Sequence, residues 1–164
     1  MKILVACIGN IFQGDDAFGC EVARVLAKRL PPSEDIRLVD FGIRGLDLTF
    51  ALLNAPELTI LVDTVMRGGT PGTLYTIEPD LEDLSAYPAE AHVDAHAMDP
   101  VQVLRAVKSL GGKLGRILLV ACEPAELGGE EGLMGLTPAV SAAVEQAADI
   151  VETLIVKEGI KVPV

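Results

Sequence analysis

"KILVACIGNIFQGDDAFGCEVARVLAKRL" (residues 2–30) contains a continuous apolar run, a glycine-rich turn and an amphipathic segment. The apolar run ends at Gly9 and is typical of a strand that is buried on both faces of a sheet. Apolar residues then recur at helical spacing from Ala17 to Leu30. Acidic residues at the start of this segment, and Lys28 and Arg29 near its end, suit the dipole of a helix. A buried strand that leads through a tight turn into a helix indicates an α/β fold.

The rest of the chain repeats this alternation. Further strands are expected over 36–42, 58–65, 73–79 and 116–124, and further helices over 45–55, 99–112 and 137–159. Because the turn at 66–72 is too short for a helical crossover, we expect the strand at 73–79 to run antiparallel to its predecessor, as in a hairpin. The pattern predicts a three-layer α/β/α fold with a mostly parallel sheet of about five strands. The length of 164 residues predicts one domain, 1–164.

The composition excludes several classes of protein. A net charge of −11 argues against a nucleic-acid partner, because such binding depends on Lys and Arg at the phosphates. No apolar stretch approaches the length of a membrane span, and we interpret the first apolar run as a strand rather than a secretory signal. The three cysteines, Cys7, Cys20 and Cys122, are widely spaced and odd in number, which favours the reducing cytoplasm over a disulfide framework.

Acidic side chains follow the strands of the predicted sheet. Asp15 and Asp16 come after the first strand, Asp63 ends the apolar run "TILV", and Glu123, a weaker candidate, follows the last strand. Ligands of such folds gather at the carboxyl edge of the sheet, so these residues are candidates for a binding site. One of Asp15 and Asp16 is expected to serve only the start of the helix.

A histidine is expected at the same edge. The chain has two histidines, His92 and His96. The segment 79–98 has to return the chain to the carboxyl edge before the helix that begins at Asp99, and His96 lies three residues before that helix. Two carboxylates and one imidazole suit a borderline divalent cation such as nickel, zinc or iron. With neither an H-E-x-x-H nor a C-x-x-C motif, a tightly held structural metal is not expected.

The turn at 9–19 does not match a nucleotide-binding loop. Cys7 stands where the first glycine of G-x-G-x-x-G belongs, and no G-K-[ST] follows. Asp15 and Asp16 would repel a pyrophosphate at the helix end that ought to attract it.

Four stretches in this order and spacing resemble the hydrogenase maturation endopeptidases, over nearly the whole chain: "ILVACIGNIFQGDDAFG", "LVDTV", "HAMDPVQVLRAVKSLGG" and "ACEPAELG". The most specific element is the signature G-N-x-x-x-x-D-[DE]-x-x-G, which is matched at Gly9, Asn10, Asp15, Asp16 and Gly19. The chain departs from the family at Ala17, where glycine is common, so the turn is expected to differ locally if φ is positive there.

The resemblance implies an endopeptidase that removes a C-terminal peptide from the nickel-loaded precursor of a [NiFe] hydrogenase large subunit. It implies Asp16, Asp63 and His96 as the residues that meet the nickel, which belongs to the substrate, and Asp16 and Asp63 as catalytic residues. His92 stays open as a second ligand or a surface residue.

The sequence leaves open which group activates or supplies the nucleophile for hydrolysis. An aspartate could activate the water, the nickel could polarise it, or Cys7 or Cys122 could act as a nucleophile. The alternative to an enzyme is a non-catalytic metal- or ligand-sensing module that docks on a partner.

Overall fold

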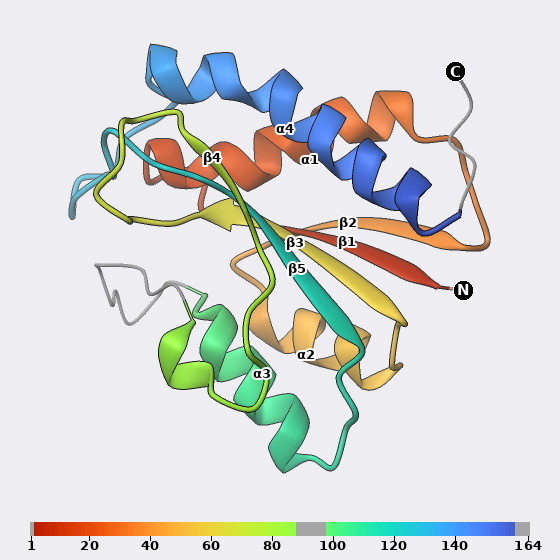
Figure 1. Ribbon diagram of the computed structural model, residues 1–164. Coiled ribbons are helices and arrows are strands. Elements are labelled where there is room, and N and C mark those ends of the chain that lie inside the picture. Colours follow the sequence, from red (N-terminus) through yellow and green to blue (C-terminus); the bar gives the residue numbers. More distant parts are fainter. Residues whose placement is uncertain (1, 88–97, 160–164) are drawn as a thin grey trace.

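Five strands form a sheet in the order β2-β1-β3-β5-β4. The computed structural model describes residues 2–87 and 98–159 (Figure 1). The strands within this part of the chain are β1 (Ile3–Ile8), β2 (Ile36–Gly42), β3 (Leu58–Thr64), β4 (Leu74–Ile77) and β5 (Arg116–Cys122). β1 pairs in parallel with β2 and β3, and β3 pairs in parallel with β5. The prediction of a mostly parallel sheet of about five strands is confirmed.

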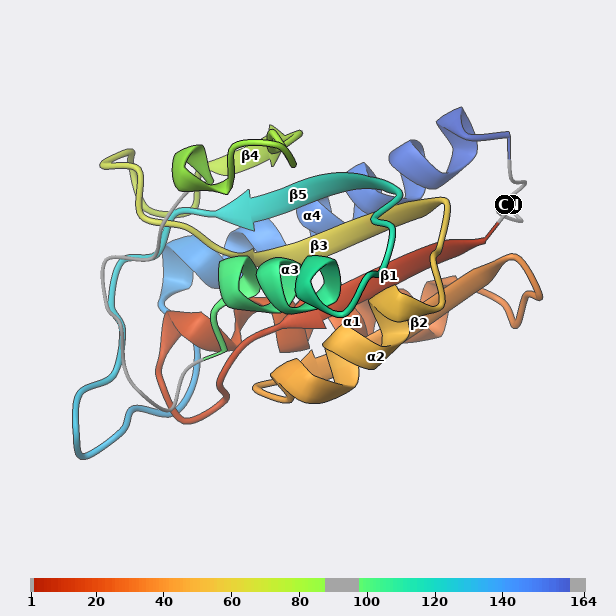
Figure 2. The same cartoon turned by 90° about the horizontal axis from the view of Figure 1, so that it is seen from below.

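Helices cover both faces of the sheet (Figures 1 and 2). They are α1 (Phe18–Arg29), α2 (Gly45–Leu53), α3 (Pro100–Ser109) and α4 (Pro138–Lys157), with short 3-10 turns η1 (Asp15–Ala17) and η2 (Leu84–Ala86). One apolar cluster joins α1 and α4 to the sheet, and a second joins α2 and α3 to its other face. The predicted three-layer α/β/α architecture is therefore confirmed.

β4 runs antiparallel to its predecessor β3, as predicted, but it does not pair with β3. β4 is antiparallel to β5, which lies between β3 and β4, so β3 and β4 do not form a hairpin. Six of the seven residues of β5 are buried, whereas those of β4 are partly buried or exposed. A strand that is apolar on both faces gains most from a central position, which leaves the edge of the sheet to β4.

The helix starts follow the local sequence. Asp99 caps α3, because its side chain accepts a hydrogen bond from the backbone N–H of Val101 at 2.9 Å, and Pro100 occupies the first turn. Ala17 has a φ of −71°, so the alanine fits the turn before α1 and no positive φ is needed there.

In the described part of the chain, no helix has the length and apolar character to cross a membrane.

Candidate functional site

The carboxyl ends of β1, β3 and β5 lie side by side at one edge of the sheet. Cys7 in β1 is level with Val62 in β3, and Asp63 is level with Ala121 in β5. The loops that leave these strands therefore start close together. The structure brings Asp16, Asp63 and Glu123 to this edge from three separate strands.

The loop after β1 folds back onto Asp16. The backbone N–H of Asn10 donates to Asp16 Oδ2 at 3.1 Å and to the Asp16 carbonyl oxygen at 3.2 Å. A side chain at Gly9 would collide with that carbonyl, and one at Gly19 would approach the carbonyl oxygen of Val62 to 2.6 Å. These two glycines let the turn and the start of α1 pack against the strand ends, which accounts for their place in the signature.

Thr64 connects the two candidate aspartates. Its hydroxyl donates to Asp16 Oδ1 at 3.2 Å, and its backbone N–H donates to Asp63 Oδ1 at 2.8 Å. Asp63 is 2% exposed, whereas Asp16 is partly exposed. The two carboxylates are thus held around one residue, with Asp16 on the accessible side. Thr64 was not predicted as a site residue; its signal in the sequence is a hydroxyl directly after a strand-end aspartate.

The environment of Asp16 opposes its negative charge. Burial raises the pKa of this carboxyl above its ordinary value, and the hydrogen bonds from Thr64 and Asn10 only partly offset that effect. A cation beside the carboxylate would supply the missing compensation. A positive charge next to Asp16 would favour its ionised form.

Asp15 has a structural role. It is fully buried, and its two oxygens accept from the backbone N–H groups of Ala125 at 2.8 Å, Glu126 at 3.0 Å and Thr137 at 2.7 Å. The hydroxyl of Thr137 donates to the same carboxylate. Asp15 thereby ties the first turn to the loop after β5 and to the start of α4. This agrees with the expectation that one acid of the pair serves the turn.

Glu123 organises the loop after β3. It is 4% exposed and accepts from the N–H of Arg67 at 2.9 Å, the N–H of Gly68 at 3.1 Å and the hydroxyl of Tyr75 at 2.9 Å. Burial raises the pKa of Glu123, but these hydrogen bonds outweigh it and hold the pKa below the usual value. These contacts give Glu123 a positioning role, and Asp16 and Asp63 remain the candidate acids of the site.

The cysteines lack the properties of a nucleophile. Burial, with nearby Asp40, raises the pKa of Cys7 well above its usual value, and burial raises that of Cys122 to about 12. A nucleophilic cysteine needs the opposite shift, because only the thiolate attacks. These pKa shifts argue against the cysteine alternative.

The third predicted ligand lies outside the described residues. His96 and its alternative His92 both fall in 88–97. The described chain resumes at Met98, which is buried in the same apolar cluster as Val65, two residues after Asp63. Within residues 2–87 and 98–159, no three His, Cys, Asp or Glu side chains are placed to hold a metal ion. The His96 assignment stays a prediction.

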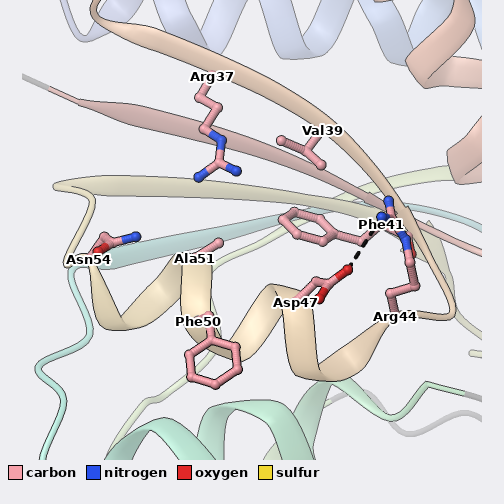
Figure 3. A pocket seen from close by; sticks show the side chains of 8 residues that line it. All are labelled: Arg37, Val39, Phe41, Arg44, Asp47, Phe50, Ala51 and Asn54. Atoms are coloured by element: carbon pink, nitrogen blue, oxygen red, sulfur yellow. Dashed lines mark hydrogen bonds and ion pairs between the residues drawn. The ribbon is translucent and has the colours of Figure 1, made fainter.

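A separate pocket of about 270 Å³ lies between β2 and α2 (Figure 3). Its lining includes Arg37, Phe41 and Phe50, and Arg44 pairs with Asp47 at its rim at 3.3 Å. Neither Asp16 nor Asp63 lines it. This pocket therefore does not belong to the carboxylate site.

Comparison with known proteins places the chain in a family. A family model described as hydrogenase maturation protease matches residues 20–154. The hydrogenase expression/formation protein HupD of Rhodobacter capsulatus is 32% identical over 146 residues, which is 89% of this chain and 67% of HupD. The hydrogenase 2 maturation protease of Escherichia coli (strain K12) is 28% identical over 161 residues, and this alignment covers 98% of this chain and 94% of the E. coli protein. The solved structure of the hydrogenase maturating endopeptidase HybD from E. coli superposes with a TM-score of 0.81 at 28% identity, and the match covers 97% of this chain and 94% of HybD.

The chain belongs to the hydrogenase maturation protease family, as the resemblance of its motifs predicted. It is accordingly a peptidase, and the alternative of a non-catalytic sensing module is set aside.

Proposed function

We propose that this peptidase removes a C-terminal peptide from the nickel-loaded precursor of a [NiFe] hydrogenase large subunit. A relative that covers almost the whole chain is named hydrogenase 2 maturation protease, which supports a hydrogenase subunit as the substrate. The observation that carries the proposal is the pair of carboxylates, Asp16 and Asp63, held around Thr64 at the carboxyl edge.

Asp16, Asp63 and His96 recognise the nickel that the precursor brings. Two carboxylate oxygens and one imidazole nitrogen are ligands that a borderline divalent cation accepts, and three ligands leave coordination positions for groups of the precursor or for water. The raised pKa of Asp16 supports this role, because an approaching cation favours the charged form that burial disfavours. The nickel is part of the substrate and is bound transiently.

Hydrolysis breaks one peptide bond of the precursor. Water adds its oxygen to the carbonyl carbon, and the amine of the released peptide takes a proton. In this proposal Asp16 or Asp63 accepts a proton from that water as a general base, or the substrate's nickel polarises the water as a Lewis acid. In both routes the two aspartates are the catalytic residues.

The free thiols support a cytoplasmic location, and the net charge argues against a nucleic-acid partner. All three cysteines are free and buried, which fits the reducing cytoplasm. The net charge of −11 opposes nucleic acid as a partner.

The test of the proposed function is incubation of the protein with nickel-loaded and nickel-free precursor, followed by measurement of the mass of the large subunit. Cleavage that is confined to the nickel-loaded sample supports the proposal, and an unchanged mass in that sample overturns it.

A further inference from the structure

Large apolar side chains are exposed around the carboxylate site. The described residues include nine such side chains, and six of them lie at the carboxyl edge of the sheet. We name these six the apolar rim: Ile11, Phe12, Ile43, Leu46, Met66 and Met134. Three of them are more than half exposed: Phe12 at 60%, Leu46 at 68% and Met134 at 69%. Exposed apolar side chains that gather in one region mark an interaction surface.

The rim is built on the same loops as the site. Phe12 lies in the loop that holds Asp16, and its N–H donates to Asn10 Oδ1 at 2.9 Å. Met66 follows Asp63 by three residues, in the loop whose backbone is bound by Glu123. The loop that carries Met134 is fastened to the first one, because Leu133 N–H donates to the Phe12 carbonyl at 2.8 Å. A molecule that contacts the rim therefore lies beside the partly exposed Asp16, whereas Asp63 is buried behind it at 2% exposure.

The spread of the rim indicates a broad partner. Its members come from the loops after β1, β2 and β3, from the first turn of α2 and from the loop before α4 (Figure 2). Neighbouring strands lie about 4.8 Å apart, so the three strand ends alone span about 10 Å across the sheet. The rim also includes Met134 in the loop before α4, so a partner that contacts all six members is broader than one extended peptide strand.

Charge narrows the chemistry of the partner surface. Glu126, Glu130 and Glu131 are exposed in the loop that carries Met134, and the chain has a net charge of −11. The border is acidic beside Met134, whereas the exposed Arg44 and Arg67 stand next to Ile43 and Met66. The rim therefore fits a partner surface that is apolar in the middle and basic on the side that meets Met134.

We infer that the apolar rim is the docking surface for the folded body of the precursor, and that it binds regions of the precursor away from the scissile peptide. This inference rests on the proposed function, because it takes the hydrogenase precursor as the partner. It assigns substrate affinity to the rim and leaves the bond-breaking step to the aspartates.

Matched serine variants test the inference. Phe12→Ser changes the loop after β1 and Leu46→Ser the first turn of α2. The controls, Leu110→Ser and Val156→Ser, change residues that are 65% and 52% exposed at the opposite, amino edge of the sheet. Thermal unfolding checks that each variant is folded. Binding to immobilised nickel-loaded precursor is measured by biolayer interferometry, and cleavage is measured separately by mass spectrometry.

Each rim variant is expected to bind the precursor about tenfold or more weakly, as for central residues of an interface, and each control to bind within about twofold of the wild type. KM for cleavage rises with little change in kcat. Unchanged binding by the rim variants, or a loss with Phe12→Ser alone, overturns the inference. Binding by the wild type without cleavage overturns the proposed function while leaving the docking surface measurable.

Discussion

The hydroxyl of Thr64 donates to Asp16 Oδ1 at 3.2 Å, across 48 residues of chain. Because Thr64 directly follows Asp63 and donates its N–H to that carboxylate, one residue sets the positions of both aspartates. The site is therefore assembled from the turn after β1 and the end of β3 before any substrate arrives.

Replacement of Thr64 by valine keeps the shape of the side chain and removes the hydroxyl. The Thr64 hydrogen bond lowers the pKa of Asp16, so its loss raises that pKa further and weakens the hold on the carboxylate. We expect processing to slow about tenfold at neutral pH, because a hydrogen bond to a charged group contributes about 1.5–3 kcal/mol. The acid limb of the pH–rate profile should move to higher pH.

Thr64→Ser is the matched control, since it keeps the hydroxyl. Its rate and its pH profile should stay close to those of the wild type. A Thr64→Val protein with an unaltered pH profile would show that the Thr64 hydroxyl does not tune Asp16.

Asp16→Asn is expected to abolish processing without loss of stability. Burial raises the folded-state pKa of Asp16, so the ionised carboxyl is less favourable in the folded state than in the unfolded state. The stability that the protonated carboxyl provides relative to the ionised one is fully present below the unfolded pKa and is lost as pH rises through the folded pKa. Asparagine does not titrate. The free energy of unfolding of the variant, relative to the wild type, should therefore be higher at pH 7 than at pH 4, as measured by urea denaturation. The opposite trend would contradict the burial of a charged Asp16.

Asp15→Asn is expected to have the opposite effect on stability. The amide nitrogen replaces one of two acceptor oxygens of a fully buried carboxylate, so either the Thr137 N–H or those of Ala125 and Glu126 lose their acceptor. Buried donors without partners cost about 1–3 kcal/mol each, so we expect a loss of about 2–4 kcal/mol in the free energy of unfolding. The adjacent Asp16→Asn variant is the control, and equal stabilities of the two variants would refute the division of roles.

The histidines are distinguished by single alanine variants. If His96 meets the nickel, His96→Ala lowers the processing rate by at least about 100-fold, since even outer-shell changes at metal sites cost 10–100-fold. His92→Ala retains most of the rate. Mass spectrometry of the processed subunit gives both rates. Full processing by the His96 variant, with loss in the His92 variant, would transfer the assignment to His92.

The sequence predicted the strands well where both faces are apolar. The runs that became β1, β3 and β5 have few alternatives to a central strand, and Asp99 with Pro100 marked the start of α3. The predicted hairpin pairing of β4 with β3 was wrong, because the length of the turn between two strands does not show whether a later strand, β5, will lie between them.

The acids of the site were harder to sort from the sequence. The candidate acids all lie at or after the carboxyl ends of strands, but their roles depend on contacts across the fold: Asp15, Asp16, Asp63 and Glu123. Asp15 and Glu123 bind the backbone N–H groups of distant loops. The hydroxyl of Thr64 reaches Asp16 only because β3 lies beside β1.

Nickel dependence of cleavage tests the central claim most directly. Wild-type protein is incubated with nickel-loaded and with nickel-free precursor, and the mass of the large subunit is measured over time, with Asp63→Asn as the inactive control. We predict loss of a C-terminal peptide from the nickel-loaded precursor by the wild type alone. Equal cleavage of the nickel-free precursor, or cleavage by Asp63→Asn at the wild-type rate, would contradict recognition of the substrate's nickel by these carboxylates.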